Sequence, residues 1–322
     1  MKQYILSGSI FALGIIAGTI FSNFSIEDYG QSKIATLRKG EFEFINPLLD
    51  CEISDGLVAV ELLPIKKRIT DLTDTLKRTH KASHISVYFR DLNNGPWFGI
   101  NEKELFSPAS LLKVPIMIAA LKQSETDPNF LNQILVHRDT LDTRNQHYQP
   151  KEKLEIGNAY TVDELIGRMI IYSDNEALHL ILSKMEEEIL NQVYAQVGVI
   201  APTIERTEDF MNVRNYASFF RILYNASYLN ENSSNKALGI LSEVRFSGGL
   251  GGGVPHNIQI AHKFGEREYL GHQQLHDCGI IYFPNHPYIL CVMNRGDDLD
   301  MLAENISEIS KAVYEEVNKQ SR

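Results

Sequence analysis

The stretch Phe106-Ser-Pro-Ala-Ser-Leu-Leu-Lys-Val-Pro-Ile-Met-Ile-Ala-Ala-Leu121 decides how the rest of the chain is interpreted. It places Ser110 three residues before Lys113, at the start of an apolar run that predicts a helix. Residues three apart lie on one helical face, so the hydroxyl and the amine should be neighbours. Burial lowers the pKa of a lysine because it disfavours the charged ammonium. A neutral amine beside a serine hydroxyl is a base beside a nucleophile, which indicates covalent acyl transfer.

The same spacing occurs a second time, at Ser233 and Lys236. That copy lies in a polar stretch with no apolar run behind it, and we expect a loop there. In the first copy, Ser107 is placed to cap the helix and Pro108 suits its first turn. Taken alone, the first copy is also compatible with an ordinary helix that carries a surface lysine.

Two further stretches complete a pattern. Tyr172-Ser-Asp-Asn-Glu-Ala177 lies beyond Thr161, which opens a helix with a capping-box signal. Ile258-Gln-Ile-Ala-His-Lys-Phe-Gly265 reads as a strand that ends in Lys-x-Gly. In this order, Ser-x-x-Lys, Ser-Asp-Asn and Lys-x-Gly form the signature of penicillin-recognising serine enzymes. Over roughly residues 64–318 the chain resembles the class A β-lactamase superfamily, which shares its catalytic lobe with penicillin-binding D,D-peptidases.

The resemblance implies a role for each reacting group. Ser110 is expected to be the nucleophile that attacks an amide or β-lactam carbonyl, and Lys113 to be the base or a proton relay toward one. Ser173 is expected to pass a proton to the departing nitrogen. Lys263 is expected to supply positive charge for the substrate carboxylate and to lower the pKa of Lys113 through like-charge proximity.

The resemblance also implies substrate-binding groups. Asn175 is expected to hydrogen-bond the substrate's side-chain amide, although a helix cap is the plainer interpretation of that residue alone. The backbone amides of Ser110 and Glu266 are expected to form an oxyanion hole, in which each donor contributes about 3 kcal/mol to the transition state. Gly265 is expected to let its strand approach the ligand closely.

Two departures from the family pattern stand out. Phe264 occupies the middle of the Lys-x-Gly motif, where the family has a threonine or serine whose hydroxyl helps bind the substrate carboxylate. Phenylalanine cannot donate that hydrogen bond and offers an apolar ring in the substrate site instead. The glutamate that activates the deacylating water in class A enzymes has no clear counterpart either. The stretch after Val199 looks too short for its loop and lacks the Glu-x-x-Leu-Asn signature, which leaves the residues Glu205, Glu208 and Asp209 as candidates by position only.

The order of patterns predicts an α/β (α+β) architecture. We expect a helix over residues 65–80, a strand pair over 84–90 and 97–100 with a turn at Asn93-Asn-Gly95, and mainly helices from 111 to 229. Two strands are expected on either side of Pro284-Asn-His-Pro287, followed by an amphipathic helix over 300–319. Together with the resemblance, this predicts an antiparallel five-stranded sheet flanked by helices, plus an all-helical lobe, with the site between the lobes.

Composition narrows the possible partners. The chain has 322 residues, 43% of them hydrophobic, and a net charge of −10 without a basic cluster, so we expect no nucleic-acid partner. Its three cysteines, Cys51, Cys278 and Cys291, show no metal-ligand spacing and no paired framework. We expect Cys278 and Cys291 on neighbouring strands as small buried residues, no metal, no cofactor and a monomer. The glycine-rich stretch Ser247–Gly253 is expected to form a flexible rim over the cleft.

The first residues predict an export signal. Residues 1–26 are predicted to be a membrane anchor or signal peptide. After Lys2, residues 3–26 carry no charge and include an apolar run long enough to cross a bilayer. We favour an uncleaved anchor over a cleaved signal peptide. The positive-inside bias then places the chain on the extracytoplasmic face of a bacterial membrane, periplasmic or at the cell surface, or secreted if the segment is cleaved. Residues 27–63 read as a stalk or linker and residues 64–320 as the serine hydrolase domain.

Three functions fit these observations. The first is an exported serine acyl-hydrolase that acts on β-lactams or D-alanyl peptides, either as a β-lactamase or as a D,D-peptidase-like penicillin-binding protein with slow deacylation. The second is a membrane-anchored receptor that signals through a partner once acylated. The third is a catalytically degenerate wall-binding relative.

Overall fold

The computed structural model describes residues 35–38, 42–52, 60–79, 81–93, 95–140, 146–150, 152–199, 201–202, 208–269 and 271–321. The chain divides into two compact units, Met1–Ala35 with Glu52–Val58, and Thr36–Cys51 with Ala59–Arg322. The predicted anchor therefore lies outside the described residues. Within the described ranges, no helix is both long and apolar enough to cross a bilayer.

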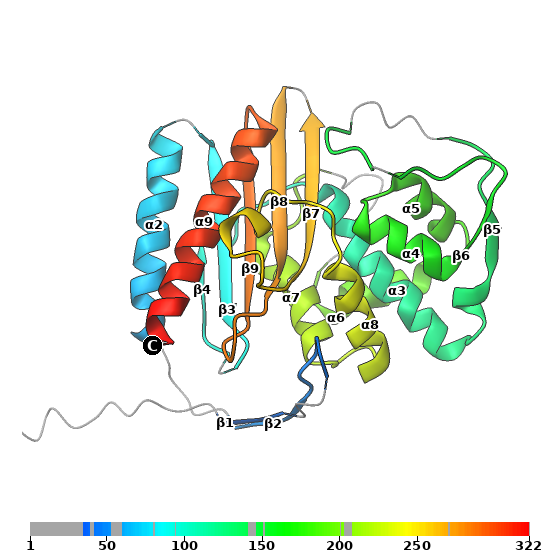
Figure 1. Cartoon of the computed structure of the whole chain (residues 1–322), viewed down its shortest axis with the longest axis horizontal. Coiled ribbons are helices and arrows are strands. Elements are labelled where there is room, and N and C mark those ends of the chain that lie inside the picture. Colours follow the sequence, from blue (N-terminus) through cyan, green and yellow to red (C-terminus); the bar gives the residue numbers. More distant parts are fainter. Residues whose placement is uncertain are drawn as a thin grey trace, which may run out of the picture. The chain divides into compact units, whose positions relative to one another are not determined.

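A five-stranded antiparallel sheet forms the centre of the second unit (Figure 1). The strand order is β4-β3-β9-β8-β7, with bounds β3 (His84–Asp91), β4 (Trp97–Ile100), β7 (Ile260–Tyr269), β8 (His272–Ile281) and β9 (Tyr288–Gly296). Short connections join β3 to β4, β7 to β8 and β8 to β9, whereas the pairing of β3 with β9 brings together strands that are far apart in the sequence. The predicted strand positions and the predicted fold class are both confirmed.

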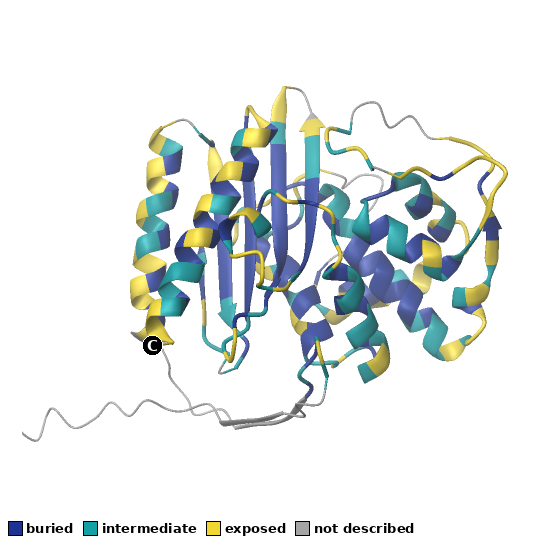
Figure 2. Cartoon of the chain, in the orientation of Figure 1, coloured by how far each residue is buried: buried dark blue, intermediate teal, exposed yellow. Residues whose placement is uncertain are grey.

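Helices cover both faces of the sheet. On one face lie α2 (Leu63–Arg78) and the C-terminal α9 (Leu299–Gln320), side by side in Figure 1. On the other face lies α7 (Val213–Tyr224), which packs on β3, β8 and β9. Figure 2 shows that the central strands are buried along most of their length, whereas α2 keeps an exposed outer face. The sheet is thus sandwiched between two apolar layers.

The helical lobe continues from the α7 side. It contains α3 (Lys113–Thr126), α4 (Val162–Ile171), α5 (Asn175–Leu182), α6 (Glu187–Gln196) and α8 (Glu231–Leu241), with the small strand pair β5 (Ile134–Val136) and β6 (Ala159–Thr161). Helix α3 is buried almost all round and forms the centre of this lobe. The predicted capping box is present, because Thr161 Oγ1 accepts from the Glu164 amide while the Glu164 carboxylate accepts from the Thr161 amide.

Two local predictions are wrong. Ser233 and Lys236 belong to α8, where the Asn230 side chain caps the first turn, so the predicted loop is a helix with a half-polar face. Cys278 and Cys291 lie directly opposite each other on β8 and β9, as neighbouring strands require, but they form a disulfide instead of remaining separate apolar residues. Sequence spacing alone did not reveal the pair, because their proximity is created by strand register.

The glycine-rich stretch also differs from its prediction. It does not form a rim over the cleft, since its short helix η4 (Gly251–Gly253) packs on α9. Ser307 Oγ donates to the Gly249 carbonyl and Ser310 Oγ to the Leu250 carbonyl. A Cβ added at Gly253 would lie 2.5 Å from the Lys311 nitrogen and the Ser307 carbonyl oxygen. The glycines are needed because two backbones meet here without room for side chains.

Part of the segment predicted as a stalk packs on the domain. Strands β1 (Ala35–Arg38) and β2 (Leu48–Glu52) pair with each other. Between them, Ile45 is 2% exposed within the helical-lobe core, and the Phe44 amide donates to Asn235 Oδ1. The residues before Pro64 therefore contribute to the domain's packing, and the boundary at residue 64 stays a prediction.

Candidate active site

Ser110 lies in a short 3₁₀ turn, η2 (Ala109–Leu112), which leads directly into α3. The turn begins at Pro108 with no side-chain cap, so the prediction that Ser107 caps this helix is wrong. The Ser107 hydroxyl instead accepts from Arg267 on β7, and its carbonyl accepts from His276 on β8. These bonds fix the turn to the sheet. Ser110 itself is half-buried, which leaves its hydroxyl accessible to a ligand.

Lys113 is the first residue of α3 and the hub of the site. Its Nζ donates to Ser110 Oγ at 2.9 Å, so the predicted pairing of amine and hydroxyl is present. The same Nζ lies within hydrogen-bond distance of three further oxygens, the Ser173 carbonyl at 2.7 Å, Ser173 Oγ at 3.1 Å and Asn175 Oδ1 at 2.7 Å, so it does not donate to all four neighbours at once. With 1% exposure, the amine has almost no contact with water.

Ser173 connects the helical lobe to the sheet. It lies between α4 and α5 with φ at +57°, an uncommon value for a residue other than glycine. The turn is held because the Asp174 carboxylate accepts from the Glu176 and Ala177 amides and caps α5. Asp174, and not Asn175, is therefore the helix cap, and the Asn175 side chain is directed to the site. A strained serine held between a cap and a lysine is typical of functional positions.

Lys263 reaches the same serine from β7. Its Nζ donates to Ser173 Oγ at 3.1 Å and to the Phe264 carbonyl at 2.8 Å, and its side chain is fully buried. Ser173 Oγ thus lies between two amines that come from separate lobes. The structure brings together all four predicted reacting residues, Ser110, Lys113, Ser173 and Lys263, through side-chain hydrogen bonds.

Burial changes the charge of both amines. It lowers the pKa of Lys113 to about 7, although the nearby carboxylates of Asp174 and Glu266 partly oppose this. Burial lowers the pKa of Lys263 well below its usual value, and repulsion from Lys113 adds to the effect. Two ammonium groups that share one serine are unfavourable. At least one amine is therefore neutral near pH 7, and it can accept the proton of a hydroxyl.

Position 265 requires glycine for a structural reason that the sequence did not reveal. A Cβ at this position would lie 2.7 Å from the Pro108 carbonyl oxygen and 2.9 Å from the Leu111 nitrogen. The glycine therefore lets β7 approach the η2 turn beside Ser110, in addition to any approach to a ligand. The oxyanion hole expected from the Ser110 and Glu266 amides stays a prediction. From α7, the Tyr216 hydroxyl donates to the Leu111 carbonyl at 2.9 Å and holds the turn from behind.

Two residues at the site, Gln146 and Tyr148, and the carboxylate of Glu266 were missed by sequence reasoning. Asn175 Nδ2 donates to Gln146 Oε1 at 3.2 Å, and Gln146 Nε2 donates to the Tyr148 carbonyl at 3.0 Å. The Tyr148 amide donates to the carboxylate of Glu266 at 2.9 Å. Burial raises the pKa of this carboxyl, and its Oε2 is buried with no hydrogen-bond partner among the described residues. The polar stretch around Gln146 has no periodicity that marks it as part of a site.

Phe264 lies on the opposite face of β7 from Ala261, within the sheet–α9 core. Its ring is 3% exposed and stacks on Phe246 with centroids 4.3 Å apart, and Tyr148 meets it edge-on at 5.8 Å. Lys263 Nζ lies 4.0 Å from its centroid. The ring closes one side of the site by packing, so little of it is offered to a ligand. Its predicted contact with substrate stays a prediction.

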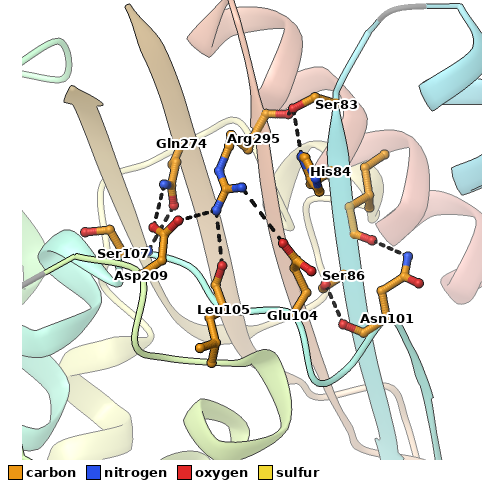
Figure 3. A network of polar contacts seen from close by, with 11 residues as sticks. Ser83, His84, Ser86, Asn101, Glu104, Leu105, Ser107, Asp209, Gln274 and Arg295 are labelled. Carbon is orange, nitrogen blue, oxygen red and sulfur yellow. Dashed lines mark hydrogen bonds and ion pairs between the residues drawn. The ribbon is translucent and has the colours of Figure 1, made fainter. Parts of the chain in front are cut away.

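The candidates for a water-activating carboxylate fare differently. The Asp209 carboxylate already has partners, because it forms an ion pair with Arg295 and accepts a hydrogen bond from Gln274 (Figure 3). Figure 3 also shows Gln274 bonded to the Ser107 amide, so this network braces the η2 turn. Glu208 is exposed, and Glu205 lies outside the described residues. Neither described carboxylate of this stretch forms a hydrogen bond or ion pair with Ser110 or Lys113. Among the described residues, no group of three or more metal-ligating side chains occurs either.

Comparisons with known proteins identify the family and the fold. A family model described as the Beta-lactamase enzyme family matches residues 64–317. Among solved structures, PBP-A aligns with a TM-score of 0.66 at 21% identity, covering 79% of this chain and 96% of that one. A PBP-A mutant has been solved as its acyl-enzyme complex with penicillin-G.

Two β-lactamase structures align with this chain with similar TM-scores. The TLA-3 extended-spectrum β-lactamase aligns with a TM-score of 0.69 at 20% identity, covering 79% of this chain and 99% of that one. A β-lactamase from Xanthomonas campestris pv. campestris aligns with a TM-score of 0.68 at 20% identity, covering 81% and 100%. At these identities the structural matches show the shared fold, while the family model carries the assignment.

Proposed function

The chain belongs to the beta-lactamase enzyme family, and from this premise we propose that it is a serine acyl-hydrolase acylated at Ser110 by β-lactams. The observation that carries the proposal is the 2.9 Å hydrogen bond between Lys113 Nζ and Ser110 Oγ, made by an amine whose pKa burial lowers to about 7. A neutral Lys113 removes the proton from Ser110 as its oxygen attacks the lactam carbonyl. The C–N bond of the ring then breaks, and the nitrogen receives a proton.

Ser173 is placed to deliver that proton. Its Oγ lies 3.1 Å from Nζ of both Lys113 and Lys263, so a proton taken by Lys113 has a continuous path through the serine hydroxyl. Lys263 adds positive charge at the end of this path, where the substrate carboxylate is expected. The amide of Asn175 is positioned beside Lys113 to orient the substrate's side chain.

We propose further that deacylation is slow. Asp209 is committed to Arg295 and Gln274 and Glu208 is exposed, which supports the view that the described residues of the stretch after α6 supply no water-activating carboxylate. Slow release of the acyl group favours a second candidate function, a D,D-peptidase-like penicillin-binding protein that acts on peptidoglycan stem peptides. Release of D-alanine from a stem-peptide analogue by the wild type, and its loss in Ser110→Ala, would distinguish this function from antibiotic hydrolysis alone.

Labelling with a fluorescent penicillin tests the proposed nucleophile. We expect the wild type to retain the label through denaturing electrophoresis and Ser110→Ala to show none. Ser233→Ala is a matched control, because Ser233 has the same Ser-x-x-Lys spacing but lies on α8, and it should label as the wild type does. Equal labelling of Ser110→Ala and wild type would refute the assignment.

Export of the chain is also part of the proposal. The support is the uncharged apolar segment within residues 1–26, preceded by Lys2. Because β-lactams and stem peptides are found outside the cytoplasm, the proposed substrates fit this location. Protease added to intact spheroplasts should digest the domain of the full chain, whereas protection until the cells are lysed would place it inside.

A further inference from the structure

A second cleft lies at the other end of the sheet from the site. It occupies about 420 Å³ between β3, β4, the turn after β4 and α7. Because the strand order is β4-β3-β9-β8-β7, this cleft is at the far edge from the Lys263 strand. It is therefore separate from the acylation site, and the reaction proposed above makes no use of it.

Positive charge converges on this cleft. Its lining includes Arg90, Lys103, Arg214 and Arg221 against a single carboxylate, that of Glu102. This is unexpected in a chain whose net charge is −10. Over the part of the chain that the structure describes, the four cationic side chains have no ion pair within 4.0 Å and no side-chain hydrogen bond. Lys103, Arg214 and Arg221 are exposed, so water solvates them, but the mutual repulsion of clustered cations is relieved when an anion binds among them.

The geometry of α7 and β3 places these cationic side chains around one cleft. Arg214, Ser218 and Arg221 are spaced i, i+4 and i+7, so they form one stripe along α7. Arg90 follows Tyr88 by two residues on β3 and therefore lies on the same face of the sheet, the face that α7 covers. The three guanidinium groups thus come from two elements packed against each other.

Packing also fixes one of the guanidinium groups. Arg214 lies over the Trp97 ring at 4.6 Å from its centroid, and Trp97 stacks on Tyr88 with centroids 5.6 Å apart. The aromatic stack holds the guanidinium in place before any ligand arrives. Partial burial lowers the pKa of Arg221, and repulsion from Arg90 and Arg214 adds to this, as expected for a guanidinium group close to two others.

We propose that this cleft binds a small molecule carrying two or more phosphate groups. Guanidinium forks match phosphate oxygens in pairs, and three of them are suited to a ligand with several negative charges. The Asn215 side chain adds a neutral polar group to the lining beside them. The volume exceeds what a single phosphate fills and lies in the range of small-molecule sites. Glu102 is the one acidic residue in the lining, and its carboxylate would repel an anion bound next to it.

Calorimetric titration of the purified full chain with sodium pyrophosphate tests the proposal. We expect the wild type to bind and Arg214→Gln/Arg221→Gln to bind at least about tenfold more weakly, because charge-assisted hydrogen bonds are lost. Arg214→Lys/Arg221→Lys keeps the charge but loses the forks and should fall between them. Lys66→Gln/Lys184→Gln removes the same charge from exposed positions elsewhere and should bind within about twofold of the wild type. Melting curves establish that each variant is folded.

A second titration identifies the source of the phosphate. Glycerophosphoglycerol presents the single phosphodiester of a lipid headgroup or polyol polymer, and tighter binding of it than of pyrophosphate would overturn the proposal of a ligand with two or more phosphate groups. Tighter binding of pyrophosphate would assign it to a free phosphorylated molecule. The proposal is overturned if the wild type binds neither probe, or if the remote lysine variant weakens binding as much as the arginine variant does.

Discussion

At the scale of single residues, Lys113 determines whether the site can react. Its amine is in contact with three other side chains of the site and almost none of the solvent. The charge of that amine decides whether it can take a proton from Ser110 or can only donate hydrogen bonds. The pH at which it loses its proton is therefore a direct readout of the proposed mechanism.

We predict that the second-order rate of acylation by benzylpenicillin rises with pH and levels off above about pH 7–8. Burial lowers the folded-state pKa of Lys113 from 10.5 to about 7, so the neutral base accumulates as pH rises through that value. The same shift means that the unfolded chain holds more protons between these two values, so this group also makes unfolding less favourable as pH rises. Stopped-flow or quenched labelling between pH 5 and 9 measures the rate. A rate that falls across this range would contradict a base role for Lys113.

Phe264→Thr restores the residue type usual for the family, yet we predict that it destabilises the protein by about 3 kcal/mol. The ring is stacked on Phe246 in the sheet–α9 core, and a threonine leaves a cavity there. Urea unfolding followed by circular dichroism gives the free energy. Leu182→Thr, at a position 42% exposed, is the control and should cost less than about 1 kcal/mol. An unchanged stability in Phe264→Thr would mean that the ring serves a ligand and not the core.

Site residues that lie within one turn of each other in the sequence could be predicted to be neighbours. The pairs Ser110–Lys113 and Ser173–Asn175 act over a single turn, so their neighbourhood follows from the sequence. Lys263 could be placed with them only through the family resemblance, since its partner is 90 residues away. Gln146 and the Glu266 carboxylate were missed because their contacts arise from a loop folded over the site.

At the scale of elements, the most informative segment is the glycine-rich stretch that packs on α9. Its composition suggested freedom of movement, but the glycines serve contact between two backbones. This is a case in which the same residue type has opposite structural meanings, and only the neighbouring element decides between them.

We predict that Gly253→Ala destabilises the protein by about 1–3 kcal/mol, because the new methyl group meets α9 at 2.5 Å and η4 must move away. Gly167→Ala is the matched control. Gly167 lies within α4 and has no heavy atom within 4 Å of its added Cβ, so alanine should stabilise by roughly 0.5–1 kcal/mol through helix propensity. Thermal melting of both variants tests the pair. Equal melting temperatures would show that the stretch is as loose as its composition suggests.

Elements with strong periodicity or alternation were predicted well, including β3, β4, α2 and α9, whose observed bounds lie within about two residues of the expected ones. The errors occurred where tertiary contacts override local pattern. Helix α8 forms from a polar stretch because one face is buried on α3, α4 and β7. The disulfide between Cys278 and Cys291 depends on the register of β8 and β9, which the sequence does not encode locally.

At the scale of the whole molecule, reaction depends on two lobes meeting at one serine. The helical lobe contributes Lys113, Ser173 and Asn175, while the sheet contributes Lys263 and positions the η2 turn through Gly265 and His276. The network around Arg295 joins the stretch after α6 to the same turn (Figure 3). The arrangement supports acylation, and the commitment of Asp209 to this network supports slow deacylation.

Intact-mass spectrometry of the full chain, followed over time after benzylpenicillin is added, tests acylation at Ser110 most directly. We predict a mass increase of one drug molecule, located at Ser110 by peptide mapping, that forms faster above pH 7 and persists long after excess drug has been removed. No adduct in folded protein, or an adduct located at a residue other than Ser110, would contradict the account.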